Sequence, residues 1–109
     1  MRTVELRIGN YITDLKSKEI RQYDQYDIGH NHIIGPVVIT DEILKKIGFV
    51  NYSIMGPDGY ELEYWPSGKY INLWPRAGAD QCIKIKCKFL HNLQNLYFCL
   101  FGVELEIKL

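Results

Sequence analysis

The stretch from Phe89 to Gly102 constrains the fold more than any other part of this sequence. Its apolar side chains recur at intervals of three and four residues, as on one face of an α-helix: Leu90, Leu93, Tyr97 and Leu100. Gly102 can adopt the left-handed conformation that closes a helix. We therefore predict a central helix that is mostly buried. Replacing Leu96 or Leu100 with alanine should destabilise the protein far more than replacing His91.

Residues 40–49 carry the signals of a second, shorter helix. Thr40 can cap its start, two acids follow in the first turn, and two lysines stand in the last turn, where they suit the helix dipole. Gly48 can close the helix, and Phe49 can then pack back on Leu44.

Alternating apolar and polar residues predict strands elsewhere. The expected strands cover residues 4–8, 11–13, 20–28, the two arms of a hairpin within 59–75, 82–88 and 103–109. In the segment 82–88, the side chains of Ile83, Ile85 and Cys87 are expected to face inward. The last strand can pair with a second copy of the chain if it lies at a sheet edge, which predicts a homo-oligomer.

The hairpin is expected to turn around residues 65–68, with Tyr64 opposite Lys69 and Leu62 opposite Ile71. This pairing places an apolar set of side chains on one face: Tyr60, Leu62, Ile71 and Leu73. The other face combines polar and aromatic side chains: Glu61, Glu63, Trp65, Tyr70, Asn72 and Trp74.

Together these elements predict a single α+β domain over residues 1–109. We expect a strongly bent, barrel-like and mainly antiparallel sheet of about six strands. One central buried helix packs against it, and one short helix lies at an edge. Two helices among several strands argue against a doubly wound parallel sheet.

The charge balance limits the classes of partner. Lys and Arg number 13, as do Asp and Glu, so the net charge is zero and any charged site must be local. No apolar signal core follows Met1, and no run of 18 apolar residues is present, so no membrane partner is expected. Three cysteines, an odd number, suit free thiols in a reducing cytosol.

The polar and aromatic face of the hairpin is the best candidate site. Aromatic rings that stack on a base, with cations at their edges for a phosphate, are a common way to hold nucleotides. The predicted ligand-binding residues are Trp65, Lys69, Tyr70, Trp74 and Arg76. The alternative is that one or both tryptophans pack as core against a second layer.

A basic stripe, Lys84, Lys86 and Lys88, can track an anionic ligand or backbone. Glu104 and Glu106 have the same spacing, so cross-strand ion pairing on a solvated face is the simpler interpretation.

Metal and catalytic chemistry have weaker support. Asp24, Asp27, His30 and His32 lie close in sequence, but no recognised spacing completes a ligand set, and whether His30 and His32 hold a metal is left open. His91 lies near Cys87 without an orienting acid. No nucleophile elbow, paired carboxylates or phosphate-binding glycine loop is present. We predict no catalytic residue, no metal and no cofactor.

Three segments, ELRIGNY at 5–11, PVVITDEILKKIGF at 36–49, and HNLQNLYF at 91–98 leading to GVEL at 102–105, form a set of landmarks. In this order they resemble an uncharacterised family of small proteins from phages and mobile elements of gut bacteria. Its members show an LRIGN opening, a PIPLTEEWLLKFGF-like helix and an HxLQNLYFALTGEEL-like close. The resemblance implies an accessory role in a mobile element, in the cytoplasm of the bacterial host.

Two functional classes follow. The first is a non-catalytic, anti-defence binding protein that sequesters a small nucleotide-like signal or a host protein. The second is a nucleic-acid-binding module, which the zero net charge disfavours because such domains are usually basic.

Overall fold

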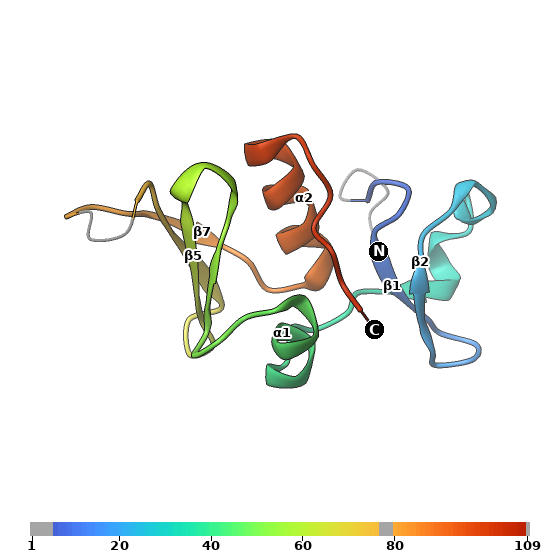
Figure 1. The fold of residues 1–109 in the computed structure, drawn as a ribbon. Coiled ribbons are helices and arrows are strands. Elements are labelled where there is room, and N and C mark those ends of the chain that lie inside the picture. The colour runs from blue at the N-terminus through green and yellow to red at the C-terminus, as the bar shows by residue number, and fades with distance from the viewer. Residues whose placement is uncertain (1–5, 77–79, 109) are drawn as a thin grey trace. The chain divides into compact units, whose positions relative to one another are not determined.

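The computed structural model describes residues 6–76 and 80–108, which contain two α-helices and two antiparallel sheets (Figure 1). The fold class is therefore α+β, as predicted. The strands form sheets of three and four strands, neither of which is closed, in place of the single bent sheet that the sequence suggested. The chain groups into two compact units: residues up to Ile39 with Phe89–Glu104, and Thr40–Lys88 with the residues from Leu105. The single domain over residues 1–109 stays a prediction.

The first unit is built on strand β1 (Tyr11–Asp14), which pairs antiparallel with β2 (Ile20–Gln22) and β3 (Ile34–Gly35). Its small core joins Ile12 of β1 with two further buried residues, Tyr23 and Ile34.

Two strands predicted for this unit differ from the structure. Residues 6–8 are not in a strand, and residues 4 and 5 lie outside the described part of the chain. The strand expected over 20–28 ends at Gln22, and a 3-10 turn, Gln25–Asp27, follows. The physical reason is a capping box, in which the carboxylates of Asp24 and Asp27 accept backbone hydrogen bonds that a strand would otherwise use.

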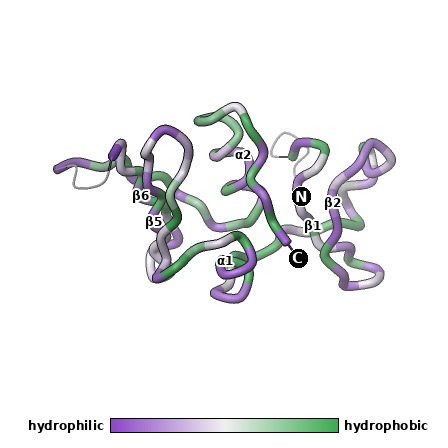
Figure 2. Tube along the Cα trace, in the orientation of Figure 1, coloured by the Kyte–Doolittle hydropathy of each residue, from purple (hydrophilic) through white to green (hydrophobic). Residues whose placement is uncertain are grey.

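Helix α2 (Leu90–Phe101) is the predicted central helix, and it ends at a left-handed Gly102 with φ of 71°. Its buried residues all lie in the first half: Leu90, His91, Leu93 and Gln94. The prediction that the whole helix is mostly buried is wrong for its second half, because Leu100 is 40% exposed. The last turn is apolar, as its colour in Figure 2 shows, and residues 98–100 are exposed.

Two polar residues of α2, the buried Gln94 and the half-buried Asn95, bind the segment that leads into β1. The side-chain oxygen of Gln94 accepts a hydrogen bond from the Tyr11 amide at 2.7 Å. Asn95 accepts bonds from Arg7 and from Asn10, each at 2.8 Å. Arg7 also forms an ion pair with Glu104, for which the sequence had suggested a lysine of the basic stripe as partner.

The second unit contains the sheet β4-β5-β6-β7, whose strands are all antiparallel to their neighbours. The strands are β4 (Ser53–Met55), β5 (Glu61–Trp65), β6 (Tyr70–Trp74) and β7 (Ile83–Lys86). The β5–β6 hairpin pairs Trp65 with Tyr70 and Leu62 with Leu73, so the predicted register is wrong by two residues. A shift of two leaves every side chain on its predicted face, since side chains alternate with a period of two.

The inner face of this sheet is the core of the second unit. Four side chains of β5 and β6 are at most 4% exposed: Leu62, Tyr64, Ile71 and Leu73. Ile83 lies opposite the buried Leu73 and so on the predicted inner face, but it is 62% exposed because it is at the start of the edge strand β7. Residues 103–108, the described part of the strand expected over 103–109, do not form a strand. The structure therefore gives no support for an oligomer that pairs through this segment.

Helix α1 (Asp41–Ile47) has the predicted signals in place. The Thr40 hydroxyl accepts a hydrogen bond from the Ile43 amide at 3.2 Å. Gly48 is left-handed with φ of 114°, and the Phe49 amide donates to the Leu44 carbonyl at 2.9 Å, which is the Schellman arrangement.

Candidate functional site

The outer face of the four-stranded sheet carries ordered rows of side chains. One row runs across three strands through Trp65, Tyr70 and Lys86, which are direct partners in the register. The next row runs through Glu63, Asn72 and Lys84. Since directly opposite residues of an antiparallel pair point to the same face, these six side chains share one surface.

An aromatic pair occupies the first row. The rings of Trp65 and Tyr70 are nearly parallel, at 8°, with centroids 6.1 Å apart. The Lys84 ammonium lies over the Tyr70 ring, 4.0 Å from its centroid, as a cation–π contact. Gly68 leaves room for this ring, because a Cβ atom there would come within 2.5 Å of it.

Glu63 organises the indole groups of this face. One carboxylate oxygen, Oε1, accepts hydrogen bonds from the indole of Trp65 at 2.8 Å, the amide of Asn72 at 3.3 Å and the indole of Trp74 at 3.4 Å. The bond from Trp65, helped by those from Asn72 and Trp74, lowers the pKa of Glu63 below its ordinary value. The carboxylate is therefore charged at neutral pH.

Charge changes sign across this face. Strand β5 contributes Glu61 and Glu63, and strand β7 contributes Lys84 and Lys86. The two strands are separated by β6, hence by about 9.6 Å, since neighbouring strands lie about 4.8 Å apart. The face thus offers hydrogen-bond acceptors at one side, cations at the other, and aromatic rings between them.

A hollow of about 320 Å³ lies beside Glu63 and Trp65. The residues that line it come from the turn before β4 and from β5 with its turn: Asn51, Tyr52, Glu63, Tyr64, Trp65 and Pro66. Its volume falls at the lower end of the range typical of small-molecule sites.

The turn that walls this hollow has unusual backbone geometry. Asn51 and Tyr52 both have positive φ, 51° and 63°, in a two-residue turn between the bridged residues Val50 and Ser53. Asparagine is common in such turns, whereas tyrosine in the second position is strained.

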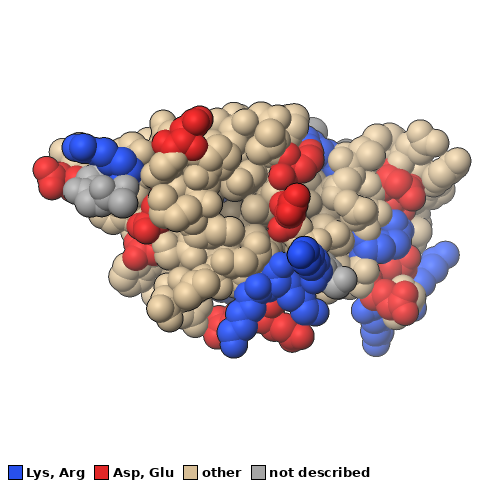
Figure 3. All heavy atoms as spheres, viewed as in Figure 1, with Lys and Arg blue, Asp and Glu red and all other residues tan. Residues whose placement is uncertain are grey.

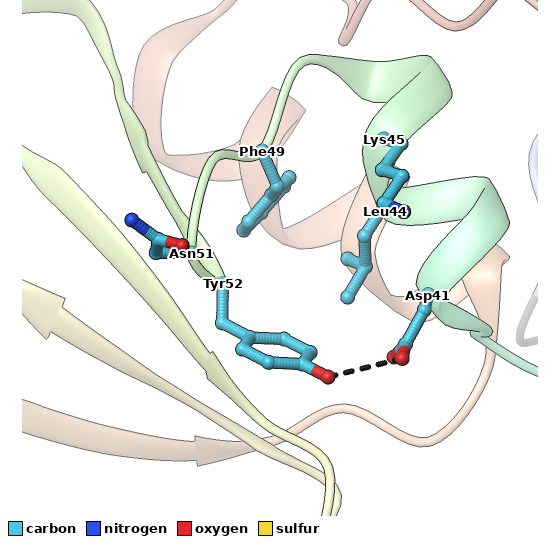
Figure 4. A pocket seen from close by; sticks show the side chains of 6 residues that line it. All are labelled: Asp41, Leu44, Lys45, Phe49, Asn51 and Tyr52. Carbon is cyan, nitrogen blue, oxygen red and sulfur yellow. Dashed lines mark hydrogen bonds between the residues drawn. The ribbon is translucent and has the colours of Figure 1, made fainter.

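A hydrogen bond holds Tyr52 in this conformation. Its hydroxyl donates to the carboxylate of Asp41 on α1 at 3.0 Å, which also raises the pKa of Tyr52 (Figure 4). On the α1 side of the ring, Leu44 and Phe49 line a second hollow of about 230 Å³. Tyr52 is therefore the shared wall of two hollows, fixed in place from α1.

The structure brings together three of the five predicted ligand-binding residues: Trp65, Tyr70 and Trp74. Lys69 lies in the turn between the first two and is exposed. Arg76 follows Trp74 by two residues and is exposed. Among the described residues, it makes no cation–π contact with the aromatic rings of this face. The alternative that both tryptophans are core is wrong for Trp65, which is 42% exposed, whereas Trp74 is half-buried on the outer face.

The sequence interpretation missed two features of this site. Lys84 and Lys86 were assigned to a separate stripe, because the sequence did not show that β7 pairs with β6. No tight turn joins these two strands, so no turn residue fixes their register. Glu63 was placed on the right face but given no role; the signal that could have identified it is its place on the same predicted face as Trp65 and Trp74, which it precedes by two and eleven residues.

The aspartates of the acidic and histidine cluster have structural roles. Both carboxylate oxygens of Asp27 bind the Arg21 guanidinium at 2.7 Å, and this contact lowers the pKa of Asp27. Within 6–76 and 80–108, no group of three His, Cys, Asp or Glu side chains is arranged to hold a metal. The three cysteines are free, as predicted, and burial raises the pKa of Cys87 to about 12, which disfavours its thiolate.

Comparison of the chain with protein-family models, curated proteins and solved structures finds no match. Across the described segments, neither helix has the length and apolar character needed to cross a membrane.

Proposed function

We propose that this protein is a non-catalytic binding protein that holds a small nucleotide-like ligand on the outer face of the sheet β4-β5-β6-β7. The observation that carries the proposal is the ordered change across this face, from the carboxylate of Glu63 through the stacked rings of Trp65 and Tyr70 to Lys84. A nucleotide has the matching order: a base edge with N–H groups, a planar ring system and an anionic phosphate.

Each part of the face has a separate task in this proposal. The indole of Trp65 supplies a flat, partly exposed surface for stacking, and stacking is tolerant of ring type. Lys84 and Lys86 neutralise the phosphate, and the exposed Lys69 in the adjacent turn adds a third cation. Catalysis is not part of the proposal.

The biological role follows from the resemblance of the sequence landmarks. We propose an accessory protein of a phage or mobile element, acting in the cytoplasm of its bacterial host and sequestering a nucleotide signal of a defence response. A host protein bound on the same face is the other partner that this role allows.

Isothermal titration calorimetry with guanosine and adenosine diphosphates tests the binding proposal. We expect saturable binding to the wild type and about tenfold weaker binding to Lys84→Gln, the effect of losing one charge-assisted contact. Lys16→Gln, which removes an exposed lysine from a turn of the first unit, is the matched control and should bind like the wild type. Absence of heat with either diphosphate, at millimolar ligand, would refute the proposal.

Single-stranded nucleic acid is the second candidate, favoured by one observation. Exposed aromatic residues on a four-stranded antiparallel sheet, with lysines on the same face, are the arrangement with which some RNA-binding domains stack bases. Against it, Glu61 and Glu63 on that face repel a phosphate backbone, and basic and acidic side chains are interspersed on the surface drawn in Figure 3. Tighter binding of an eight-nucleotide strand than of a mononucleotide, with a steep salt dependence, would favour this candidate.

A further inference from the structure

We propose that the hollow beside Glu63 is a base pocket selective for guanine, read through the second carboxylate oxygen of Glu63. This inference rests on the proposed nucleotide-binding function and names the class of base. It concerns residues on the β4 side of the sheet, Asn51 and Tyr52 among them, which lie outside the set first predicted to bind a ligand.

The two oxygens of Glu63 have different surroundings. Oε1 accepts the hydrogen bonds of Trp65, Asn72 and Trp74, and these fix the plane of the carboxylate. None of the hydrogen bonds given for the described residues reaches Oε2. The carboxylate also lines the hollow of about 320 Å³, so its remaining acceptor capacity is available to a ligand there.

The chemistry of this acceptor distinguishes the purines. A charged carboxylate can only accept hydrogen bonds. Guanine presents two adjacent donors, N1–H and the N2 amino group, whereas adenine presents its N6 amino group beside N1, an acceptor that a carboxylate repels. Hypoxanthine keeps N1–H but lacks the amino group. The expected order of affinity is therefore guanine, then hypoxanthine, then adenine.

The walls of the hollow fit a purine ring system. The indole of Trp65 and the ring of Pro66 line one part of it, and the strained turn of Asn51 and Tyr52 lines another. The Asn51 side chain carries an amide donor that suits the O6 carbonyl of guanine. The hydrogen bond from Tyr52 to Asp41 holds this wall in place before a ligand arrives.

The position of the hollow sets the direction of the ligand. It lies at the β5 side of the face, so a base placed there has its phosphate directed across β6 toward Lys84 and Lys86. Strands β5 and β7, at the two ends of this path, are about 9.6 Å apart. An extended nucleoside diphosphate spans such a distance. The base and phosphate contacts are thus made by different strands.

The first test measures the affinities of GDP, IDP and ADP for the wild-type protein by calorimetry. We expect GDP to bind at least about tenfold more tightly than ADP, with IDP between them, because guanine offers two donors to Oε2 whereas adenine sets its N1 acceptor against the charge.

The diagnostic variant is Glu63→Gln. Its amide oxygen can still accept from the indoles, while its amide nitrogen opposes the N1–H donor of guanine, so GDP and ADP should bind within about twofold of each other. Glu61→Gln, on the same strand and face but outside the hollow, is the matched control and should keep the preference for GDP. An unchanged melting temperature and tryptophan emission maximum would show that Glu63→Gln keeps the fold.

The outcomes separate the two proposals. Equal binding of GDP and ADP to the wild type, or a preference that survives Glu63→Gln, would overturn the guanine pocket and leave the nucleotide-binding function standing. No binding of any of the three nucleotides would overturn both.

Discussion

At the scale of single residues, the outer face depends on a few side chains whose positions are mutually fixed. Glu63 holds both indole groups, and Lys84 lies on the ring of Tyr70. Gly68 contributes by lacking a side chain, since the Tyr70 ring occupies the space that a Cβ atom would need. The Tyr70 ring thus leaves no space for a side chain at position 68, so this position requires glycine.

Gly68→Ala tests this dependence. The added methyl group must displace the Tyr70 ring, which separates it from Trp65 and from Lys84. We expect a loss of about 1 kcal/mol in the free energy of unfolding, the lower end of the cost of overpacking because the ring is half-buried and can move. Near-ultraviolet circular dichroism should change as well. Ser67→Ala, in the same turn, is the control, and an identical effect of both variants would contradict this explanation.

At the scale of elements, the sequence correctly predicted the helices and strands whose signals lie close together in the chain. The cap residues Thr40 and Gly48 define α1 within ten residues, and alternation in the hairpin sets which side chains are inward. The hairpin register was missed because residues 65–68 and 66–69 both make a four-residue loop, and a shift of two changes no face. The pairing of β7 beside β6, which assembles the candidate site, depends on contacts between distant segments.

Helix α2 shows the same limit. Its periodicity predicted the helix, but not which residues are covered, because burial depends on what packs against it. His91 is 0% exposed and its ring stacks on Phe89 with centroids 5.7 Å apart, whereas Leu100 is 40% exposed. Burial therefore predicts the opposite order of importance for His91 and Leu100 from that expected from the sequence.

Alanine variants of α2 check this reversal in a denaturant titration. His91→Ala should lower the free energy of unfolding by about 2 kcal/mol or more, because it empties a fully buried ring site. Leu100→Ala should cost less than about 1 kcal/mol, since much of its side chain is already in water. A larger loss for Leu100→Ala would show that the second half of the helix is covered.

At the scale of the whole molecule, formal charge is balanced, yet paired carboxylates make stability depend on pH. The Arg21 guanidinium lowers the pKa of Asp27 below its ordinary value of 3.8, and Arg7 likewise lowers the pKa of Glu104. Backbone hydrogen bonds, led by that of Lys16, lower the pKa of Asp14. A depressed folded pKa contributes stability above the unfolded pKa, and that contribution is lost as the pH falls through the folded value.

We therefore expect the urea midpoint to be constant near neutral pH and to fall below about pH 4, where the unfolded state begins to bind more protons. Asp27→Asn should lower the midpoint at pH 7 and weaken its dependence on acid. Asp58→Asn, at an exposed turn, serves as the control. A midpoint that does not change between pH 7 and pH 3 would contradict the assignment of these ion pairs.

The central claim is that the outer sheet face binds a nucleotide, and intrinsic fluorescence tests it most directly. Both tryptophans of the chain, Trp65 and Trp74, lie on this face and share the Glu63 carboxylate, so any ligand that stacks there must alter their emission. We predict a saturable change in tryptophan emission on titration with GDP, which weakens as salt rises because the lysine contacts are screened. Emission that stays constant up to millimolar GDP at low salt would contradict the claim.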